Sequence, residues 1–379
     1  MKNTDYIGEI FGHKEVNISK HSPNRNIIIS GISGSGKSVR IANIEKRAIA
    51  SGETVLALDL NGTHEVETET DVVFISAQKD GINIKILDTS FVEKGEETPA
   101  NLIEFAMEIL CPRSMRGSCQ LEAVREAIKY AIKNRRLYSS EMEAIKFWLE
   151  SQDNLASKGA YHYLCDILDS EIFRRSDKCI QIGKMNIISL KGVNPKTQNR
   201  IVEILLKVLW KQLRIRGKCI HNITLEIDEF QNLDINKSTI LFQLLSEARK
   251  YGLRLILSTQ TLTIFSRQQL AIINQAAVKL FFQQAASDLK KVADLIDSAH
   301  RDRWIDELRR LKVGQAITVG ELELAGRSLS RPIITSSQYK EDEPNEQSNS
   351  SNFATANFNT ARGSCIHRFR HAEGARNQF

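Results

Sequence analysis

The stretch IIISGISGSGKS, residues 27–38, decides the fold of this 379-residue chain. Its first four residues suit a buried strand, and a glycine-rich turn that ends in Lys37-Ser38 follows directly. A turn with a purely structural role needs one glycine, whereas this one has three within six positions. Glycines let the backbone N–H groups turn inward around a bound group. The stretch therefore indicates a binding loop between a strand and a helix.

This loop fits the phosphate-binding pattern G-x-x-x-x-G-K-[ST] from Gly31 to Ser38. The pattern predicts that a phosphate lies at the positive end of the following helix. Lys37 is expected to reach the β- and γ-phosphates of a nucleotide, and the Ser38 hydroxyl is expected to bind Mg²⁺. The residues expected to hold ATP are Ser33, Gly34, Ser35, Gly36, Lys37, Ser38 and Val39.

Apolar runs alternate with helical patterns over residues 25–97 and again over residues 179–335. Continuous apolar runs are typical of parallel strands that are buried on both faces. Such alternation predicts an α/β fold with a mostly parallel, doubly wound sheet. The predicted strands are 26–30, 54–60, 71–76, 82–88, 185–190, 222–228, 253–259 and 278–283.

An all-helical block is expected to interrupt this alternation at residues 98–178. It contains four amphipathic stretches, and Ser140 and Glu143 have the spacing of a capping box at the start of the third. The four predicted helices are 99–111, 119–134, 140–152 and 155–170.

The two ends of the chain show less hydrophobic periodicity than the rest. Residues 1–24 form a short N-terminal segment with little periodicity. Residues 336–379 are polar and nearly free of aliphatic side chains, which predicts a disordered tail. The basic end of this tail is compatible with nucleic-acid binding, although an unstructured end is the favoured interpretation.

Composition restricts the possible class of protein less than the motifs do. Lys and Arg number 52 against 46 Asp and Glu, a net charge of +6 that permits contact with a polyanion but also describes an ordinary surface. The basic clusters at 133–136 and 214–218 could face a pore, but each alone is expected to face solvent. With no signal peptide, no apolar run of the ~20 residues that a membrane span needs, and no C-x-x-C pair, we expect a reduced, cytoplasmic protein without a membrane segment.

A second candidate site follows the strand in ITLEIDEFQNL, residues 223–233. An acidic pair at the end of a strand is by default a solvated turn. Beside a phosphate-binding loop, however, Asp228 can orient Mg²⁺ through its water shell. Glu229 can act as the general base that polarises the attacking water. We therefore favour the catalytic interpretation.

Three further residues have weaker signals. Gln260 ends the next strand, where its amide could sense the γ-phosphate. Asp59 ends the segment VLALD, residues 55–59, where an acidic residue can simply cap the following loop. Arg249 lies in the last turn of a helix, where a cation is favourable in any case by ~0.3–1 kcal/mol. Its spacing alone leaves this helix-end interpretation in place, against that of an arginine finger for a neighbouring subunit.

Taken together, the segments ISGSGKS, LALDLNGTH, LEIDEFQNL and LSEARKYGLRLILSTQT occur in the order found in the HerA/FtsK superfamily of hexameric DNA-pumping ATPases. The chain most resembles HerA-like proteins and type IV coupling proteins, over roughly residues 24–335. The segment EARKYG, followed by an apolar strand and Thr-Gln, is the most specific of these.

The resemblance implies a RecA-like P-loop NTPase core with an inserted all-helical subdomain. It assigns ATP and Mg²⁺ to Lys37 and Ser38, catalysis to Glu229, and γ-phosphate sensing to Gln260. It makes Arg249 a finger that acts in trans, and it supports Asp59 as an active-site acid.

The sequence also departs from the family. Thr63 stands where the family often has glutamate, and we leave His64 as a surface residue. HerA proteins usually begin with a small β-barrel, which some 25 residues cannot form, and the membrane helices of coupling proteins are absent.

The resemblance implies an ATP-dependent DNA translocase or helicase. It would act as a homohexameric ring with ATP sites between subunits, paired with a nuclease or another effector in DNA processing or defence against phage. One alternative is an ATP-binding ring scaffold that regulates an effector without translocating. Another is a soluble coupling ATPase of the conjugation type. DNA-stimulated ATPase activity distinguishes translocase from scaffold.

Overall fold

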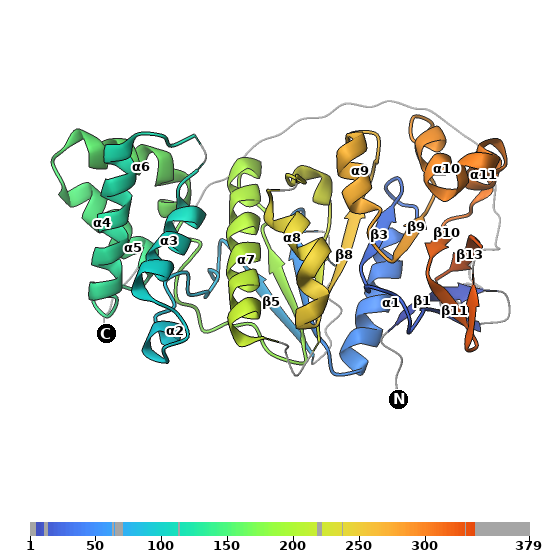
Figure 1. The fold of residues 1–379 in the computed structure, drawn as a ribbon, viewed down its shortest axis with the longest axis horizontal. Helices are drawn as coiled ribbons and strands as arrows, with labels where there is room; N and C mark the ends of the chain where they lie inside the picture. Colours follow the sequence, from blue (N-terminus) through green and yellow to red (C-terminus); the bar gives the residue numbers. More distant parts are fainter. Residues whose placement is uncertain are drawn as a thin grey trace, which may run out of the picture. The chain divides into compact units, whose positions relative to one another are not determined.

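A single mixed sheet organises the chain (Figure 1). The computed structural model describes residues 5–10, 14–62, 64, 71–112, 114–217, 222–236, 238–329 and 331–337. The sheet contains 13 strands within these ranges. Its parallel part follows the spatial order β9 (Val278–Phe281), β3 (Ile27–Ser30), β8 (Leu253–Thr259), β7 (Ile223–Ile227), β4 (Thr54–Asp59), β6 (Met185–Ser189) and β5 (Val72–Ser76).

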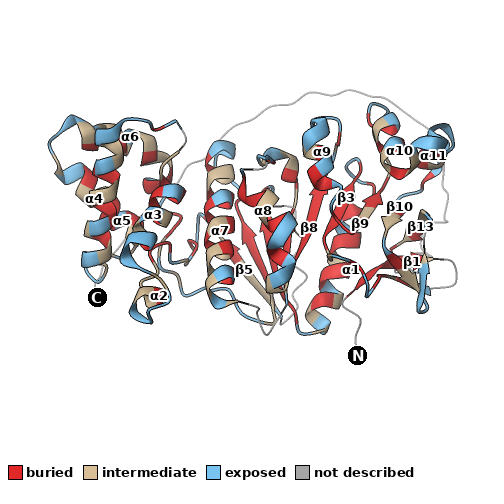
Figure 2. Cartoon of the chain, in the orientation of Figure 1, coloured by how far each residue is buried: buried red, intermediate tan, exposed pale blue. Residues whose placement is uncertain are grey.

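Helices cover both faces of this parallel part. Ile27 and Ile29 of β3 pack in one core with Ile44 of α1 (Lys37–Ala50). Ile28 points to the other face, into the larger core shared by α7 (Pro195–Arg216) and α8 (Ile240–Glu247). Figure 2 shows the resulting pattern, with buried strands in the centre and exposed outer sides on the helices. The predicted doubly wound α/β fold is confirmed.

The predicted helical block is present between β5 and β6. Its helices are α2 (Ser90–Glu93), α3 (Pro99–Leu110), α4 (Ser118–Asn134), α5 (Glu141–Ser151) and α6 (Leu155–Leu168). The Ser140 side chain accepts a hydrogen bond from the Glu143 N–H at 3.1 Å, as predicted. The reciprocal bond differs, because the Glu143 carboxylate accepts from the Ser139 N–H at 2.8 Å.

One predicted strand is wrong. Residues 82–88 form no strand, although Ile82, Ile86 and Leu87 are buried and Ile84 is half-buried. The Ile82 N–H donates to the Ile172 carbonyl at 2.7 Å, and the Leu87 N–H donates to the Glu141 carboxylate at 2.8 Å. The segment thus buries its apolar residues against the helical block and the chain that leaves it, without joining the ladder of the sheet.

An antiparallel extension of the sheet was not predicted. It continues from β9 in the order β10 (Gln315–Gly320), β13 (Ile333–Ser336), β1 (Tyr6–Ile10), β2 (Lys14–Ile18), β11 (Leu322–Leu324) and β12 (Arg327–Leu329). The N-terminal segment therefore contributes two strands, and Ser336, which we had placed in the tail, closes β13. The rest of the predicted tail from residue 338 lies outside the described residues.

The remaining helices are α9 (Arg267–Ile273), α10 (Leu289–Asp297) and α11 (Arg301–Arg310). None of the helices in the described ranges combines the length and the apolarity that crossing a bilayer requires.

Arg40 of α1 joins the parallel and antiparallel parts. It is fully buried, and its guanidinium donates to the Ile7 carbonyl of β1 at 3.0 Å and to the Thr335 hydroxyl of β13 at 2.9 Å. Further bonds go to the Ser337 hydroxyl at 2.8 Å and to the Gly314 carbonyl at 3.2 Å. Burial lowers the pKa of Arg40 to about 10, so the group stays charged at neutral pH.

Replacing Arg40 should therefore destabilise the whole sheet. Arg40→Ala leaves buried acceptors unpaired and a cavity behind, so the free energy of unfolding should fall by about 3 kcal/mol or more in chemical denaturation. Arg47→Ala is the matched control on the same helix, because Arg47 makes a partly exposed ion pair with Glu15. It should lose about 1 kcal/mol or less. Equal losses would contradict the role given to Arg40.

Candidate active site

All the predicted site residues except Arg249 lie at one edge of the parallel sheet. Asp59, Asp228 and Gln260 directly follow or end β4, β7 and β8, and the glycine-rich loop follows β3. These four strands are consecutive neighbours in the sheet. Carboxyl ends of parallel strands meet at the same edge, which is the usual ligand site of open α/β sheets.

The P-loop (residues 31–38) has the backbone that its glycines allow. Gly34 and Gly36 have φ of 75° and 101°, a region that side chains other than glycine rarely adopt. The Lys37 ammonium lies inside the loop and donates to the Gly31 carbonyl at 2.7 Å and to the Ile32 carbonyl at 3.0 Å. Burial lowers the pKa of Lys37, and the nearby charges of Glu229 and Asp228 act in the opposite direction.

The loop is supported from the antiparallel side by Gly314, which sequence reasoning missed. The Gly314 N–H donates to the Ser35 carbonyl at 2.9 Å. A Cβ atom on Gly36 would lie 2.8 Å from both the N and the Cα atom of Gly314. The two glycines therefore allow a backbone approach that no side chain would permit, and this holds the phosphate-binding turn in place.

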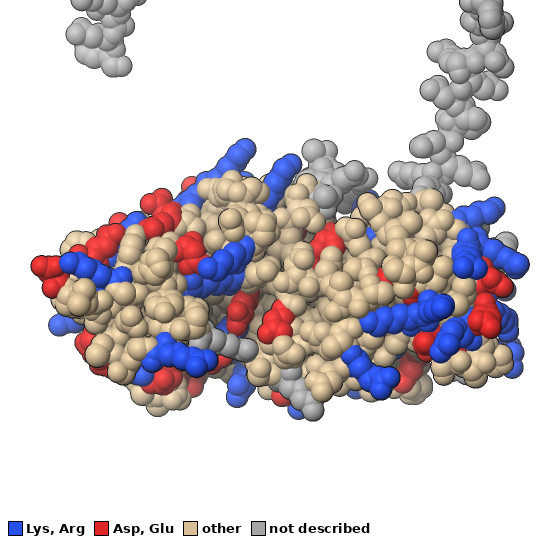
Figure 3. All heavy atoms as spheres, turned by 90° about the horizontal axis from the view of Figure 1, so that it is seen from above, with Lys and Arg blue, Asp and Glu red and all other residues tan. Residues whose placement is uncertain are grey.

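The outer side of the loop is open. Ser33, Gly34, Ser38 and Val39 are exposed, whereas Ser35 is buried. The described part of the chain also exposes three other apolar residues in loops at this edge, namely Ile32, Ile264 and Val313. Figure 3, seen from above, shows that this face is mostly uncharged, with a few Asp and Glu side chains in its middle and a group of Lys and Arg side chains toward its right end.

Glu229 is held in an unusual backbone conformation. Its φ is 53° and its ψ 41°, a left-handed geometry that non-glycine residues adopt rarely and that clusters at functional sites. The side chain is buried, and its two carboxylate oxygens accept hydrogen bonds from the side-chain amides of Gln260 and Gln231. The carboxylate is thus fixed in orientation, as a general base must be.

Neither glutamine was predicted to bind the Glu229 carboxylate. Gln260 was expected to face the γ-phosphate, and in this structure it donates to Glu229. Gln231 was missed, although its place two residues after Glu229 was a signal. Ser258 was also missed, and its hydroxyl donates to Asp228.

Asp59 caps the turn that follows β4. One carboxylate oxygen accepts from the Gly62 N–H at 2.7 Å and the other from the His64 N–H at 3.4 Å. His64 is not the surface residue that we expected, because its Nε2 lies 3.4 Å from the buried carboxylate of Glu45. Its pKa is raised by this partner, against the effect of burial. Thr63 lies outside the described residues.

Arg249 is not brought to this edge. It precedes β8, and its guanidinium donates to the carbonyl of Pro23, which precedes β3. Arg249 therefore lies at the amino ends of the strands, on the opposite edge of the sheet from its own P-loop.

The donor set suits Mg²⁺ bound together with a nucleotide. Mg²⁺ usually takes one or two protein oxygens and completes its shell with phosphates and water. The exposed Ser38 hydroxyl and the Asp228 carboxylate are such hard oxygen donors. The described residues contain no cluster of three or more His, Cys, Asp or Glu that could hold a metal ion.

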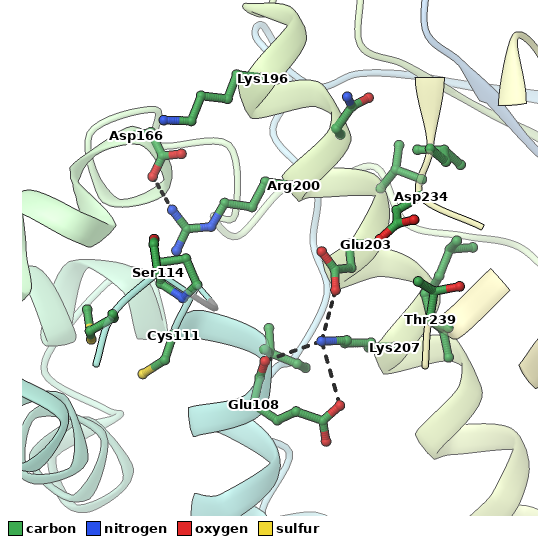
Figure 4. Close-up of a pocket in the computed structure, with 18 of the residues that line it drawn as sticks. Glu108, Cys111, Ser114, Asp166, Lys196, Arg200, Glu203, Lys207, Asp234 and Thr239 are labelled. Atoms are coloured by element: carbon green, nitrogen blue, oxygen red, sulfur yellow. Dashed lines mark hydrogen bonds and ion pairs between the residues drawn. The ribbon is translucent and has the colours of Figure 1, made fainter. Parts of the chain in front are cut away.

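A separate cavity of about 1070 Å³ lies between α7 and the helical block (Figure 4). Arg200 of α7 donates to the Leu110 carbonyl at 2.6 Å and pairs with Asp166. Lys207 pairs with Glu203 at 3.0 Å. The opposite wall of the cavity includes residues 232–234 of the loop that leaves Glu229. Arg200 and Lys207 are thus paired with carboxylates, whereas no dashed line joins Lys196 to another residue drawn in Figure 4.

Two curated proteins are similar to this chain, and both are named DNA double-strand break repair helicase HerA. The protein from Saccharolobus solfataricus is 20% identical over 343 residues, and that from Sulfolobus acidocaldarius is 22% identical over 347 residues. Each match covers 83% of this chain and 66% of the relative, so the chain spans about two thirds of the relatives' length. No protein-family model matches.

Solved structures of related fold are also similar to this chain. VirB4 of Thermoanaerobacter pseudethanolicus superimposes with a TM-score of 0.67 at 16% identity, covering 90% of this chain and 98% of that one. These similarities in sequence and fold support the predicted resemblance to the HerA/FtsK superfamily of P-loop ATPases. The bacterial conjugative coupling protein TrwB has the same fold, with a TM-score of 0.61 at 14% identity and 89% coverage of both chains. TrwB has also been solved with the ATP analogue ADPNP, and with ADP and Mg²⁺.

Removal of the P-loop ammonium tests this site directly. Lys37→Ala should weaken nucleotide binding by about 10- to 100-fold, because a charge-assisted contact to phosphate contributes roughly 1.5–3 kcal/mol. Titration with a fluorescent ATP analogue measures this. Lys46→Ala, an exposed lysine on the same helix, is the control and should bind as the wild type does. Wild-type affinity in Lys37→Ala would contradict the assignment.

Proposed function

We propose that the protein hydrolyses ATP to move along or unwind DNA, as a homohexameric ring with nucleotide sites between subunits. The observation that carries the ATPase part is the orientation of Glu229 beside the P-loop: a strained backbone and two glutamine amides hold a buried carboxylate at the carboxyl edge of the sheet. The DNA part is supported by the repair helicases and the conjugative coupling protein that the chain resembles.

Each residue has a role that follows from its position. The backbone of the P-loop and Lys37 bind and orient the phosphates, and Lys37 must leave the carbonyls of Gly31 and Ile32 to do so. Glu229 accepts the proton of the attacking water while Gln231 and Gln260 hold its carboxylate. When bound between Ser38 and Asp228, Mg²⁺ would neutralise charge on the phosphates. Asp59 orders the turn beside them.

A catalytic role for Arg249 would require an assembly of several copies, such as a ring. Arg249 cannot reach its own P-loop from the opposite edge of the sheet, so any contribution to hydrolysis requires a second copy of the chain. The exposed Ile32, Val39 and Val313 would gain cover from such a neighbour.

An effector protein such as a nuclease completes the proposal, with DNA-end processing or defence against phage as its setting. The name shared by the curated relatives, which refers to repair of double-strand breaks, supports the DNA-processing setting. Stimulation of the ATPase by DNA tests the motor itself. A rate that DNA leaves unchanged would favour the ring scaffold instead.

Glu229→Gln separates binding from chemistry. The variant keeps the size of the side chain and one of its two acceptor oxygens but loses the base, so ATP should still bind while turnover falls by about 100-fold or more. Nucleotide titration and a phosphate-release assay measure the two quantities. Hydrolysis at the wild-type rate would refute the role of Glu229.

Arg249→Ala tests the trans-acting finger. The variant ring should bind ATP but hydrolyse it about a thousandfold more slowly, as expected when charge in the transition state is not stabilised. Mixing it with Glu229→Gln subunits should restore part of the activity, because one kind of interface then combines an intact Glu229 with an intact Arg249. Co-assembled rings that stay inactive would exclude a finger in trans.

A further inference from the structure

A basic groove lies on the side of the chain away from the P-loop. It is a cavity of about 290 Å³ that three segments line: residues 83–90 after β5, residues 135–142 around the turn from α4 to α5, and residues 173–175 after α6. β5 is the edge strand of the sheet, and four strands separate it from β3. Five cations line the groove, namely Lys85, Arg135, Arg136, Arg174 and Arg175.

The acidic side chains in the groove do not balance these cations. Glu93 pairs with Arg135 at 2.8 Å, so these two charges cancel. Glu141 is buried and accepts the Leu87 N–H, and burial raises its pKa to about 7, so its carboxyl is partly neutral near physiological pH. The third acid, Asp88, accepts the Ser90 N–H at 3.1 Å. The groove therefore keeps a net positive charge.

Three of the cations are available to a ligand. Lys85, Arg136 and Arg175 are exposed, and none of them makes a hydrogen bond or an ion pair with another described residue. The cavity of Figure 4 is different, because Arg200 and Lys207 are paired with carboxylates there. The sequence alone indicated that the basic cluster at 133–136 faces solvent. In the folded chain, cations from two distant segments lie beside this cluster.

A fourth cation is fixed in place by the backbone. The Arg174 guanidinium donates to the carbonyls of Glu171, Gln78 and Lys79 at 2.6, 2.9 and 2.8 Å. A Cβ atom on Gly81 would lie 2.5 Å from Arg174 Cγ, so the local backbone leaves room for this side chain. Carbonyl oxygens orient the guanidinium without cancelling its charge, which is a suitable arrangement for binding an anion.

We propose that this groove binds the phosphodiester backbone of a nucleic-acid strand. The inference rests on the proposed function and adds the place of contact: the helical block, remote from the ATP site. Guanidinium groups match phosphate oxygens in shape and charge, and repeated phosphates suit cations from three separate segments. Phe173, the one aromatic side chain among the described lining residues, is buried. The contact is therefore to the backbone, without stacking on bases or readout of sequence.

The test neutralises the three unpaired cations together. A Lys85→Gln, Arg136→Gln, Arg175→Gln variant should bind a fluorescent single-stranded oligonucleotide at least about tenfold more weakly at about 100 mM salt. The slope of log affinity against log salt should fall in magnitude by about 2, because each lost phosphate contact removes about 0.7. Neutralising three exposed lysines elsewhere is the matched control: Lys20→Gln, Lys46→Gln and Lys290→Gln should leave the slope within about 0.5 of wild type.

The outcomes separate this inference from the proposed function. Wild-type protein that binds no DNA would refute the proposed function and the groove with it. DNA binding that the triple variant retains with an unchanged salt slope would refute the groove alone. Thermal melting of the variant at the wild-type temperature shows that lost binding is not lost folding. If the variant loses binding of polyglutamate but keeps that of DNA, the groove recognises an acidic protein, and our inference is overturned.

Discussion

The buried guanidinium of Arg40 connects the nucleotide loop to the rest of the sheet. It lies one turn after Lys37 and contacts β1, β13 and Gly314. Gly314 in turn binds Ser35 within the P-loop. A buried charge is tolerated only where its hydrogen bonds are complete, so these elements can move little relative to one another. The antiparallel strands are therefore part of the support of the phosphate-binding loop, although they carry no predicted catalytic residue.

The catalytic edge combines strain with fixed polar groups. Glu229 adopts a left-handed backbone that costs of the order of 1–3 kcal/mol, and surrounding contacts must compensate for it. The stacked rings of Phe230 and Phe265, with centroids 5.2 Å apart, anchor the residue that follows. Gln231 and Gln260 then hold the carboxylate from two sides. If Glu229 is the general base that we propose, its carboxylate is positioned before substrate binds, which would reduce reorganisation during the reaction.

The sequence predicted the parallel core and the P-loop well because these features depend on local patterns. Buried parallel strands are apolar runs, and helix starts such as Ser140 have recognisable caps. The antiparallel strands were missed because Tyr6–Ile10 and Lys14–Ile18 are short, contain glycine and charged residues, and gain stability from pairing with distant segments. The opposite error at residues 82–88 has a related cause, since burial against helices produces the same apolar pattern as a strand. Gln231, Ser258 and Gly314 depend on three-dimensional contacts that no spacing rule specifies.

The two proposed sites are connected through α7. Arg200 ties this helix to the carbonyls of Leu110 and Tyr163 in the helical block, which also carries part of the basic groove. The cavity of Figure 4, which α7 and the helical block line, is also bounded by the loop that leaves Glu229. The helical block, α7 and the loop after Glu229 therefore line one common cavity, which brings the helical block near the proposed general base. Contiguity is what mechanical coupling requires, but coupling itself needs an element with two alternative arrangements. The loop after Glu229 is the natural place to look for one, because relief of its strained backbone would move the carboxylate.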